Sequence, residues 1–149
     1  MNSKNIGNIG EIKVISKFVE LGCPVYLPFG DNEKADLIAE FNGKLNKIQV
    51  KTSIKAEDGK MIFSLVSSTL HRKNGVKHIY TEEEIDYFAC YNIARDKIYL
   101  IKVKDAPSTG ITIRYEKPKN NQTKDIKFED DYLIENILCV ETLHEIPND

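Results

Sequence analysis

The dipeptide Asn42-Gly43 constrains this chain most strongly, because it separates two runs of residues that alternate as β-strands do. The runs cover residues 35–41 and 44–52. A type I′ turn needs positive φ at both central residues, and Asn-Gly meets that need well. The sequence therefore predicts a β-hairpin whose strands are joined by a two-residue turn.

A two-residue turn also fixes which residues face each other across the hairpin. Phe41 is expected opposite Lys44, and Asp36 opposite Gln49. Lys51 falls on the same face as Gln49, because side chains alternate along a strand. The other face carries apolar residues suited to a core, namely Leu37, Ala39, Phe41, Ile48 and Val50. A β-bulge would shift this register by one residue, which is the alternative pairing.

The polar face of the hairpin combines an acid, an amide and an ammonium group: Asp36, Gln49 and Lys51. Oxygen donors of this kind suit Mg²⁺, which polarises phosphate groups and lowers the pKa of bound water. The Lys51 ammonium could hold the resulting hydroxide or stabilise charge on the phosphate. Glu11 could add a second carboxylate if the preceding helix packs on the sheet. A surface cluster of salt bridges is the alternative interpretation.

The rest of the pattern predicts helices at both ends of the chain and strands between them. Apolar residues at i, i+3 and i+4 predict a helix over 10–22, with Asn8 as its N-cap and Glu11 in its first turn. Further strands are expected over 61–67, 86–93, 97–103 and 111–116, a loop over 117–124 and a helix over 128–138. This order predicts a single α/β domain over 1–149, with a mixed central sheet and helices on both faces.

Charge is distributed unevenly along the chain, although the formal net charge is only -2. Residues 42–78 contain eight basic residues (Lys or Arg) and two acidic ones, and residues 111–127 contain five basic and two acidic residues. Residues 128–149 contain seven acidic residues and no Lys or Arg. DNA-binding domains are usually more basic overall, but a local basic face would suit phosphate contacts. Ordinary solvation of the surface is the alternative. The candidate DNA contacts are Lys55, Arg72, Lys73, Arg114, Lys119, Asn121, Gln122 and Lys124.

The three cysteines, Cys23, Cys90 and Cys139, form no C-x-x-C pair, so we expect buried, reduced thiols rather than disulfides or a zinc site. No apolar run approaches the roughly 18 residues that span a bilayer. Residues 1–12 are polar where a signal peptide would need an apolar block. We therefore expect a cytoplasmic protein that does not bind a membrane.

Three short motifs occur in order along the first part of the chain: Gly7-x-x-Gly10-Glu11, Asp36-Leu37-Ile38 and Gln49-Val50-Lys51. Together they resemble the PD-(D/E)XK nuclease superfamily, over residues 7–52. Further along the chain, Asp86-Tyr87-Phe88 and Ile98-Tyr99-Leu100-Ile101 resemble the downstream strands of a small bacterial branch. This branch includes endonucleases encoded within group I introns. Ala35 departs from the superfamily's Pro. Gln49 stands where most members have Glu or Asp, although the intron-encoded branch is similar in having Gln here.

The resemblance implies a restriction-endonuclease-like fold, with a mixed central β-sheet flanked by helices and a catalytic hairpin. It also implies Mg²⁺-dependent hydrolysis of phosphodiester bonds, with Mn²⁺ as a possible substitute. By the same resemblance, Asp36 would be the main metal ligand and Glu11 an accessory ligand. Gln49 would contribute its amide oxygen, and Lys51 would activate the nucleophile.

The resemblance further implies that the substrate is double-stranded DNA, cut at a specific site by an intron-encoded homing endonuclease. Cutting both strands requires two active sites close together, so a homo-oligomer, dimer or tetramer, is expected. A Holliday-junction resolvase and a restriction-type nuclease are alternatives within the superfamily. A DNA-binding module that has lost activity through Gln49, or an interaction domain without DNA affinity, is the alternative outside it.

Overall fold

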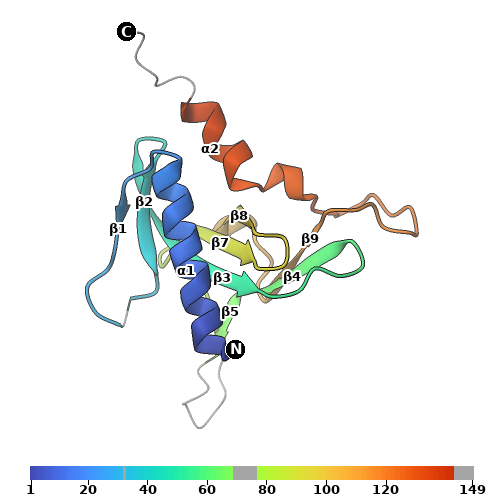
Figure 1. Ribbon diagram of the computed structural model, residues 1–149, viewed down its shortest axis with the longest axis horizontal. Coiled ribbons are helices and arrows are strands. Elements are labelled where there is room, and N and C mark those ends of the chain that lie inside the picture. The colour runs from blue at the N-terminus through green and yellow to red at the C-terminus, as the bar shows by residue number, and fades with distance from the viewer. Residues whose placement is uncertain (32, 69–76, 143–149) are drawn as a thin grey trace.

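The structure is a computed structural model that describes residues 1–31, 33–68 and 77–142 (Figure 1). The elements in chain order are α1 (Ser3–Glu20), β1 (Val25–Tyr26), β2 (Leu37–Phe41), β3 (Lys44–Ser53), β4 (Lys60–Ser64), β5 (Val66–Ser68), β6 (Lys77–Ile79), β7 (Tyr87–Asn92), β8 (Lys97–Lys102), η1 (Val103–Asp105), β9 (Gly110–Arg114), η2 (Glu129–Asp131) and α2 (Ile134–Thr142). The central sheet has five strands in the order β1-β2-β3-β7-β8. Two smaller sheets pair β4 with β9 and β5 with β6.

The predicted hairpin is present with the predicted register. β2 and β3 are antiparallel, with Phe41 opposite Lys44 and Leu37 opposite Ile48. Asn42 and Gly43 have φ values of 56° and 67°, as a type I′ turn requires. β3 then pairs in parallel with β7, and β7 pairs antiparallel with β8, which makes the central sheet mixed.

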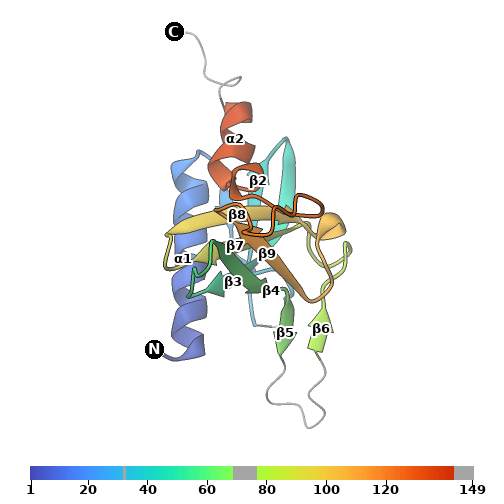
Figure 2. The ribbon, with the colours of Figure 1, turned by 90° about the vertical axis from the view of Figure 1, so that its right-hand side faces the viewer.

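A separate hydrophobic core covers each face of the central sheet. On one face, Val14 and Phe18 of α1 pack with Leu37, Ile48 and the other hairpin residues for which a core position is predicted. α2 contributes to this same core through Ile134 and Leu138. On the opposite face, the core is built from β4, β7, β8 and β9, and includes Met61, Phe63, Phe88, Tyr99, Ile111 and Ile113. The small β4–β9 sheet therefore covers the face where a second helix was expected (Figure 2).

The first helix begins earlier than predicted, which changes the position of Glu11. α1 starts at Ser3, and the side chain of Asn2 caps it by accepting a hydrogen bond from the Asn5 amide at 2.9 Å. The expected helix start at residue 10 and the expected N-cap at Asn8 are wrong, because Gly7 and Gly10 lie inside the helix. Glu11 consequently lies in the middle of α1 rather than in its first turn.

The predicted strand over 61–67 is divided at Leu65. Residues before Leu65 pair with β9 and residues after it pair with β6. The Leu65 amide donates to the Thr109 carbonyl at 3.0 Å, so the chain changes partner here without losing a hydrogen bond. The β5–β6 pair extends away from the main body (Figure 2). The predicted helix over 128–138 is likewise divided, into η2 and α2.

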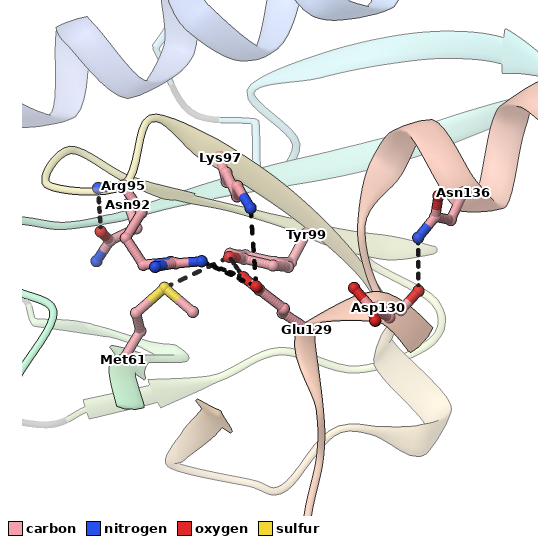
Figure 3. A network of polar contacts seen from close by, with 8 residues as sticks. All are labelled: Met61, Asn92, Arg95, Lys97, Tyr99, Glu129, Asp130 and Asn136. Carbon is pink, nitrogen blue, oxygen red and sulfur yellow. Dashed lines mark hydrogen bonds and ion pairs between the residues drawn. The ribbon is translucent and has the colours of Figure 1, made fainter. Parts of the chain in front are cut away.

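A polar network attaches the segment after β9 to the β7–β8 turn (Figure 3). The Arg95 guanidinium donates to both carboxylate oxygens of Glu129, at 2.8 and 3.0 Å, and lies 4.0 Å from the centre of the Tyr115 ring. The Tyr99 hydroxyl also donates to Glu129, at 2.8 Å. Arg95 thus contacts both ends of the segment that follows β9.

Two further expectations concern burial and membranes. Cys23 and Cys90 are buried, as expected, while the side chain of Cys139 lies outside the described residues. Within the described ranges, none of the helices combines the length and the apolar composition that a bilayer span requires.

Candidate active site

Asp36 lies directly before β2, at the point where β2 and β3 stop pairing. Its amide donates to the Ile48 carbonyl at 2.8 Å, and its carboxylate accepts a hydrogen bond from the Val50 amide at 2.8 Å. The carboxylate thus satisfies a strand amide that β2 no longer reaches. The last paired position is Leu37 with Ile48, so Asp36 and Gln49 flank the end of the ladder and do not form a pair of it.

Glu11 reaches the hairpin because α1 approaches β3 very closely at Gly10. A Cβ atom placed on Gly10 would lie 1.8 Å from Oγ1 of Thr52, a distance that no real side chain could tolerate. Only glycine therefore lets the helix axis come this near the strand. The next residue, Glu11, is carried to the Asp36 carboxyl group, with which it shares a hydrogen bond.

The Glu11 carboxyl group is harder to ionise than an ordinary glutamate because it is partly buried and lies beside Asp36. Burial, followed by the charge and hydrogen bond of Asp36, raises the pKa of Glu11 to about 7. Burial also raises the pKa of Asp36, although the Val50 amide, Glu11 and Lys51 oppose that shift. Two nearby carboxyls disfavour double ionisation. Positive charge placed between the two carboxyls would favour their ionised forms.

Lys51 lies on the β3 face opposite α1, beside the second core. Its Nζ atom donates to the Val66 carbonyl at 3.0 Å and lies 5.0 Å from the centre of the Tyr80 ring. Burial lowers the pKa of Lys51, and the charges of Asp36 and Cys90 oppose this shift. Lys51 and Asp36 are thus close enough to interact electrostatically, as the hairpin pattern predicted.

Of the four predicted site residues, Gln49 makes the weakest side-chain contact. Its Nε2 atom donates to the Val50 carbonyl at 3.4 Å, near the limit for a hydrogen bond, and its Cα partner on β7 is Phe88. Although both residues are described, no hydrogen bond joins Gln49 to Asp36. Its amide oxygen is an acceptor that could coordinate a metal ion.

Two hollows lie on either side of these residues. A cleft of about 340 Å³ is lined by Glu11 and Asp36 together with residues of the β1–β2 loop. A groove of about 680 Å³ runs between the start of α1, the end of β3 and the start of β4, and Lys51 is among the residues that line it. The Glu11–Asp36 pair and residue Lys51 therefore each border a hollow of the surface.

The residues at the hairpin end fit a divalent cation by their donor chemistry. The described residues contain no group of three or more His, Cys, Asp or Glu side chains that could hold a metal alone. The carboxyls of Glu11 and Asp36, with the amide oxygen of Gln49, nevertheless offer the hard oxygen donors that Mg²⁺ prefers. DNA phosphate oxygens and water commonly complete such sites.

The candidate DNA contacts occupy several surfaces. Lys55 lines the groove beside Lys51 and forms an exposed ion pair with Glu57 at 3.9 Å. Arg114 donates to the carbonyls of Glu116 and Asp58, at 2.9 and 3.3 Å. The exposed candidates in the segment between β9 and η2 are Lys119, Asn121, Gln122 and Lys124. Arg72 and Lys73 lie outside the described residues.

Two groups at the site were missed by the sequence interpretation. The Val66 main-chain carbonyl carries no signal in the sequence. Tyr80 is not among the predicted site residues, because a tyrosine next to a strand is more often a half-buried packing residue. Only the pairing of β5 with β6 brings both groups to Lys51.

Comparisons with known proteins bear on the family and the fold of this chain. A family model described as PD-(D/E)XK endonuclease matches residues 1–135. Among solved structures, the chain is similar to the bacterial homing endonuclease I-Ssp6803I, with a TM-score of 0.74 and 20% sequence identity over 99% of this chain and 100% of that one. At this identity the structural match shows a shared restriction-endonuclease-like fold. No curated protein matches the sequence.

Proposed function

We propose that this chain, which belongs to the PD-(D/E)XK endonuclease family, cuts double-stranded DNA at a specific site in a reaction that requires a divalent metal ion, Mg²⁺ by preference. The observation that carries the proposal is the Asp36 carboxylate at the end of the hairpin, which accepts a hydrogen bond from the Val50 amide and has the Glu11 carboxyl and the Lys51 ammonium as neighbours. Family membership establishes the class of enzyme. The metal, the named residues and the site specificity are the proposal.

In this proposal, Asp36, Glu11 and the Gln49 amide oxygen hold the metal ion, which when bound polarises the scissile phosphate and acidifies a water molecule. The Val50 amide keeps the Asp36 carboxylate oriented through its 2.8 Å hydrogen bond. Lys51 donates hydrogen bonds to the attacking oxygen or to the phosphate as negative charge develops there. Its ammonium is compact and has three donors, which suits a point charge on phosphate.

In this proposal the DNA backbone lies along the larger groove and reaches the metal site past Lys51. Lys51 lines it, and Lys55 lies further along its wall. The exposed residues between β9 and η2 would contact DNA beyond the groove, with Asn121 and Gln122 suited to base edges. A site read over many base pairs is what an intron-homing endonuclease requires, and I-Ssp6803I is described as a homing endonuclease.

Cutting of both strands would need a second copy of the chain, because one domain holds one such site. We therefore propose a homo-oligomer, dimer or tetramer. Sedimentation velocity with and without DNA tests this, and a monomer under both conditions would contradict it.

The proposal is tested by nicking of supercoiled plasmids that carry fragments of the source genome. Product should form with Mg²⁺ or Mn²⁺ and be absent with EDTA. Asp36→Ala and Lys51→Ala should each abolish it, while the exposed Lys44→Ala, at the far end of the hairpin, should not. Cleavage by either site variant at the wild-type rate would refute the assigned roles. Linear, four-way and methylated DNAs distinguish a homing endonuclease from a resolvase or restriction-type enzyme.

One observation favours a second function. Gln49 supplies no charge where a carboxylate is usual, so the metal site loses one negative unit. A module that binds DNA without cutting it would keep salt-sensitive DNA affinity and yield no product with either metal.

A further inference from the structure

The Lys51 ammonium is held by neutral groups. Its Nζ atom donates a hydrogen bond to the Val66 main-chain carbonyl at 3.0 Å and lies 5.0 Å from the centroid of the Tyr80 ring. Among the residues that the structure describes, no ion pair joins Lys51 to a carboxylate, and Asp36 acts on it only as a nearby charge. Val66 lies in β5 and Tyr80 directly follows β6, so both groups come from the same two-stranded sheet.

The Tyr80 ring is itself fixed from several sides. It meets the Phe88 ring edge-on, with centroids 5.7 Å apart and an interplanar angle of 89°. It meets the His78 ring in the same manner, at 5.1 Å and 86°. Its hydroxyl hydrogen-bonds Ser67. Phe88 is buried and is the Cα partner of Gln49, so the orientation of the ring is tied to the strand pairing at the site.

We propose that Tyr80 is a positioning residue for the reaction: its ring face and the Val66 carbonyl form a neutral cage that fixes the Lys51 ammonium and leaves its positive charge for the substrate phosphate. This inference rests on the proposed function of Lys51. A carboxylate in the same place would hold the lysine equally well but would neutralise it. The ring quadrupole and the carbonyl dipole attract the cation without cancelling its charge, and more strongly where water is excluded.

Two substitutions distinguish the contribution of the Tyr80 ring from that of its hydroxyl. In single-turnover cleavage of a plasmid that the wild-type protein nicks with Mg²⁺, Tyr80→Phe keeps the ring and should retain the rate within about twofold. Tyr80→Leu loses the ring and should slow the step by about tenfold at saturating enzyme, with unchanged half-saturation by DNA. Tyr26→Leu makes the same substitution on β1, away from Lys51, and should leave the cleavage rate unchanged. Tyr80→Leu at the wild-type rate, or Tyr80→Phe as slow as Tyr80→Leu, would overturn the proposal.

A second measurement tests the cage without DNA or metal. In protein labelled with ¹³C at lysine Cε, the Lys51 signal is identified by its loss in Lys51→Met. Ring current from Tyr80 should move that signal upfield of the exposed lysines in the wild type and in Tyr80→Phe. It should return to their position in Tyr80→Leu. An unshifted wild-type signal would overturn the cage, whereas a shifted signal in a protein that cuts no DNA supports the cage and refutes the proposed function.

Discussion

The Glu11 and Asp36 carboxyl groups share one hydrogen bond, although one lies in the middle of a helix and the other at the end of a hairpin. Such a contact between two acids is unfavourable when both are ionised. A structure that maintains it is arranged for a ligand rather than for stability. Changes at this pair should therefore affect stability and metal binding in opposite directions.

Glu11→Gln should stabilise the metal-free protein at alkaline pH. The pKa of Glu11 is about 7 in the folded protein and 4.5 when unperturbed, so the folded state binds its proton more tightly. The stability this provides is complete below pH 4.5 and is lost as the pH rises through 7. Glutamine never ionises, so Glu11→Gln should gain about 1–2 kcal/mol at pH 8 relative to pH 4.5, after allowance for partial exposure.

This pH-dependent gain is measured by urea unfolding in EDTA at both pH values. Glu33→Gln, which removes an exposed acid from the same cleft, is the matched control and should show much less change. An equal gain for Glu11→Gln at both pH values would contradict the raised pKa of Glu11.

Two glycines of α1 should respond to alanine in opposite directions. Gly10→Ala places a methyl group against Thr52 and should destabilise the fold by about 1–3 kcal/mol, the usual range for overpacking. A Cβ atom placed on Gly7 would have nothing within 4 Å, so Gly7→Ala should stabilise the helix by about 0.5–1 kcal/mol. Thermal unfolding compares them, and Thr52→Ala should partly rescue Gly10→Ala. Equal effects of the two alanines would refute the close approach.

Gln49→Glu should tighten metal binding and weaken the metal-free fold. The substitution adds a charged oxygen donor to the Glu11–Asp36 pair, and ligand charge raises the affinity for hard cations. The Mg²⁺ concentration that gives half-maximal cleavage should fall, while the free energy of unfolding in EDTA should decrease. Unchanged Mg²⁺ dependence would show that Gln49 does not face the metal.

Glu129→Ala should destabilise the protein more than Lys97→Ala. Glu129 accepts hydrogen bonds from Arg95 and Tyr99 in a largely buried position, whereas Lys97 lies 3.7 Å from it and is more exposed. Removing one partner of a buried network costs about 3–5 kcal/mol, and an exposed ion pair contributes about 0–1 kcal/mol. Urea unfolding of the two variants measures the difference. If both variants lose a similar free energy of unfolding, the Arg95–Glu129 contact does not contribute the expected stability.

The local parts of this fold follow from the sequence, and the long-range parts do not. Asn42-Gly43 predicts the hairpin and its register, because a short turn leaves one pairing that buries the apolar face. The same logic places Lys51 on the opposite face. The start of α1 is mispredicted because glycines inside a helix resemble its boundary.

The candidate site also combines features that the local sequence predicts with features that depend on long-range packing. Asp36 and Lys51 are predicted by hairpin geometry, and Glu11 by a motif, but its contact with Asp36 depends on how closely α1 packs at Gly10. The Val66 carbonyl and Tyr80 depend on the change of partner strand at Leu65. Nothing in the local pattern of residues 61–67 distinguishes one continuous strand from two short ones.

The parallel pairing of β3 with β7 has a consequence for synthesis of the chain. Residues of the hairpin emerge from the ribosome well before Tyr80 and Phe88, yet the surroundings of Lys51 require both. Pairing between strands so distant in sequence forms late in folding. A nascent chain that already carries Asp36 and Lys51 therefore lacks the groups that surround the Lys51 ammonium until β7 has been synthesised.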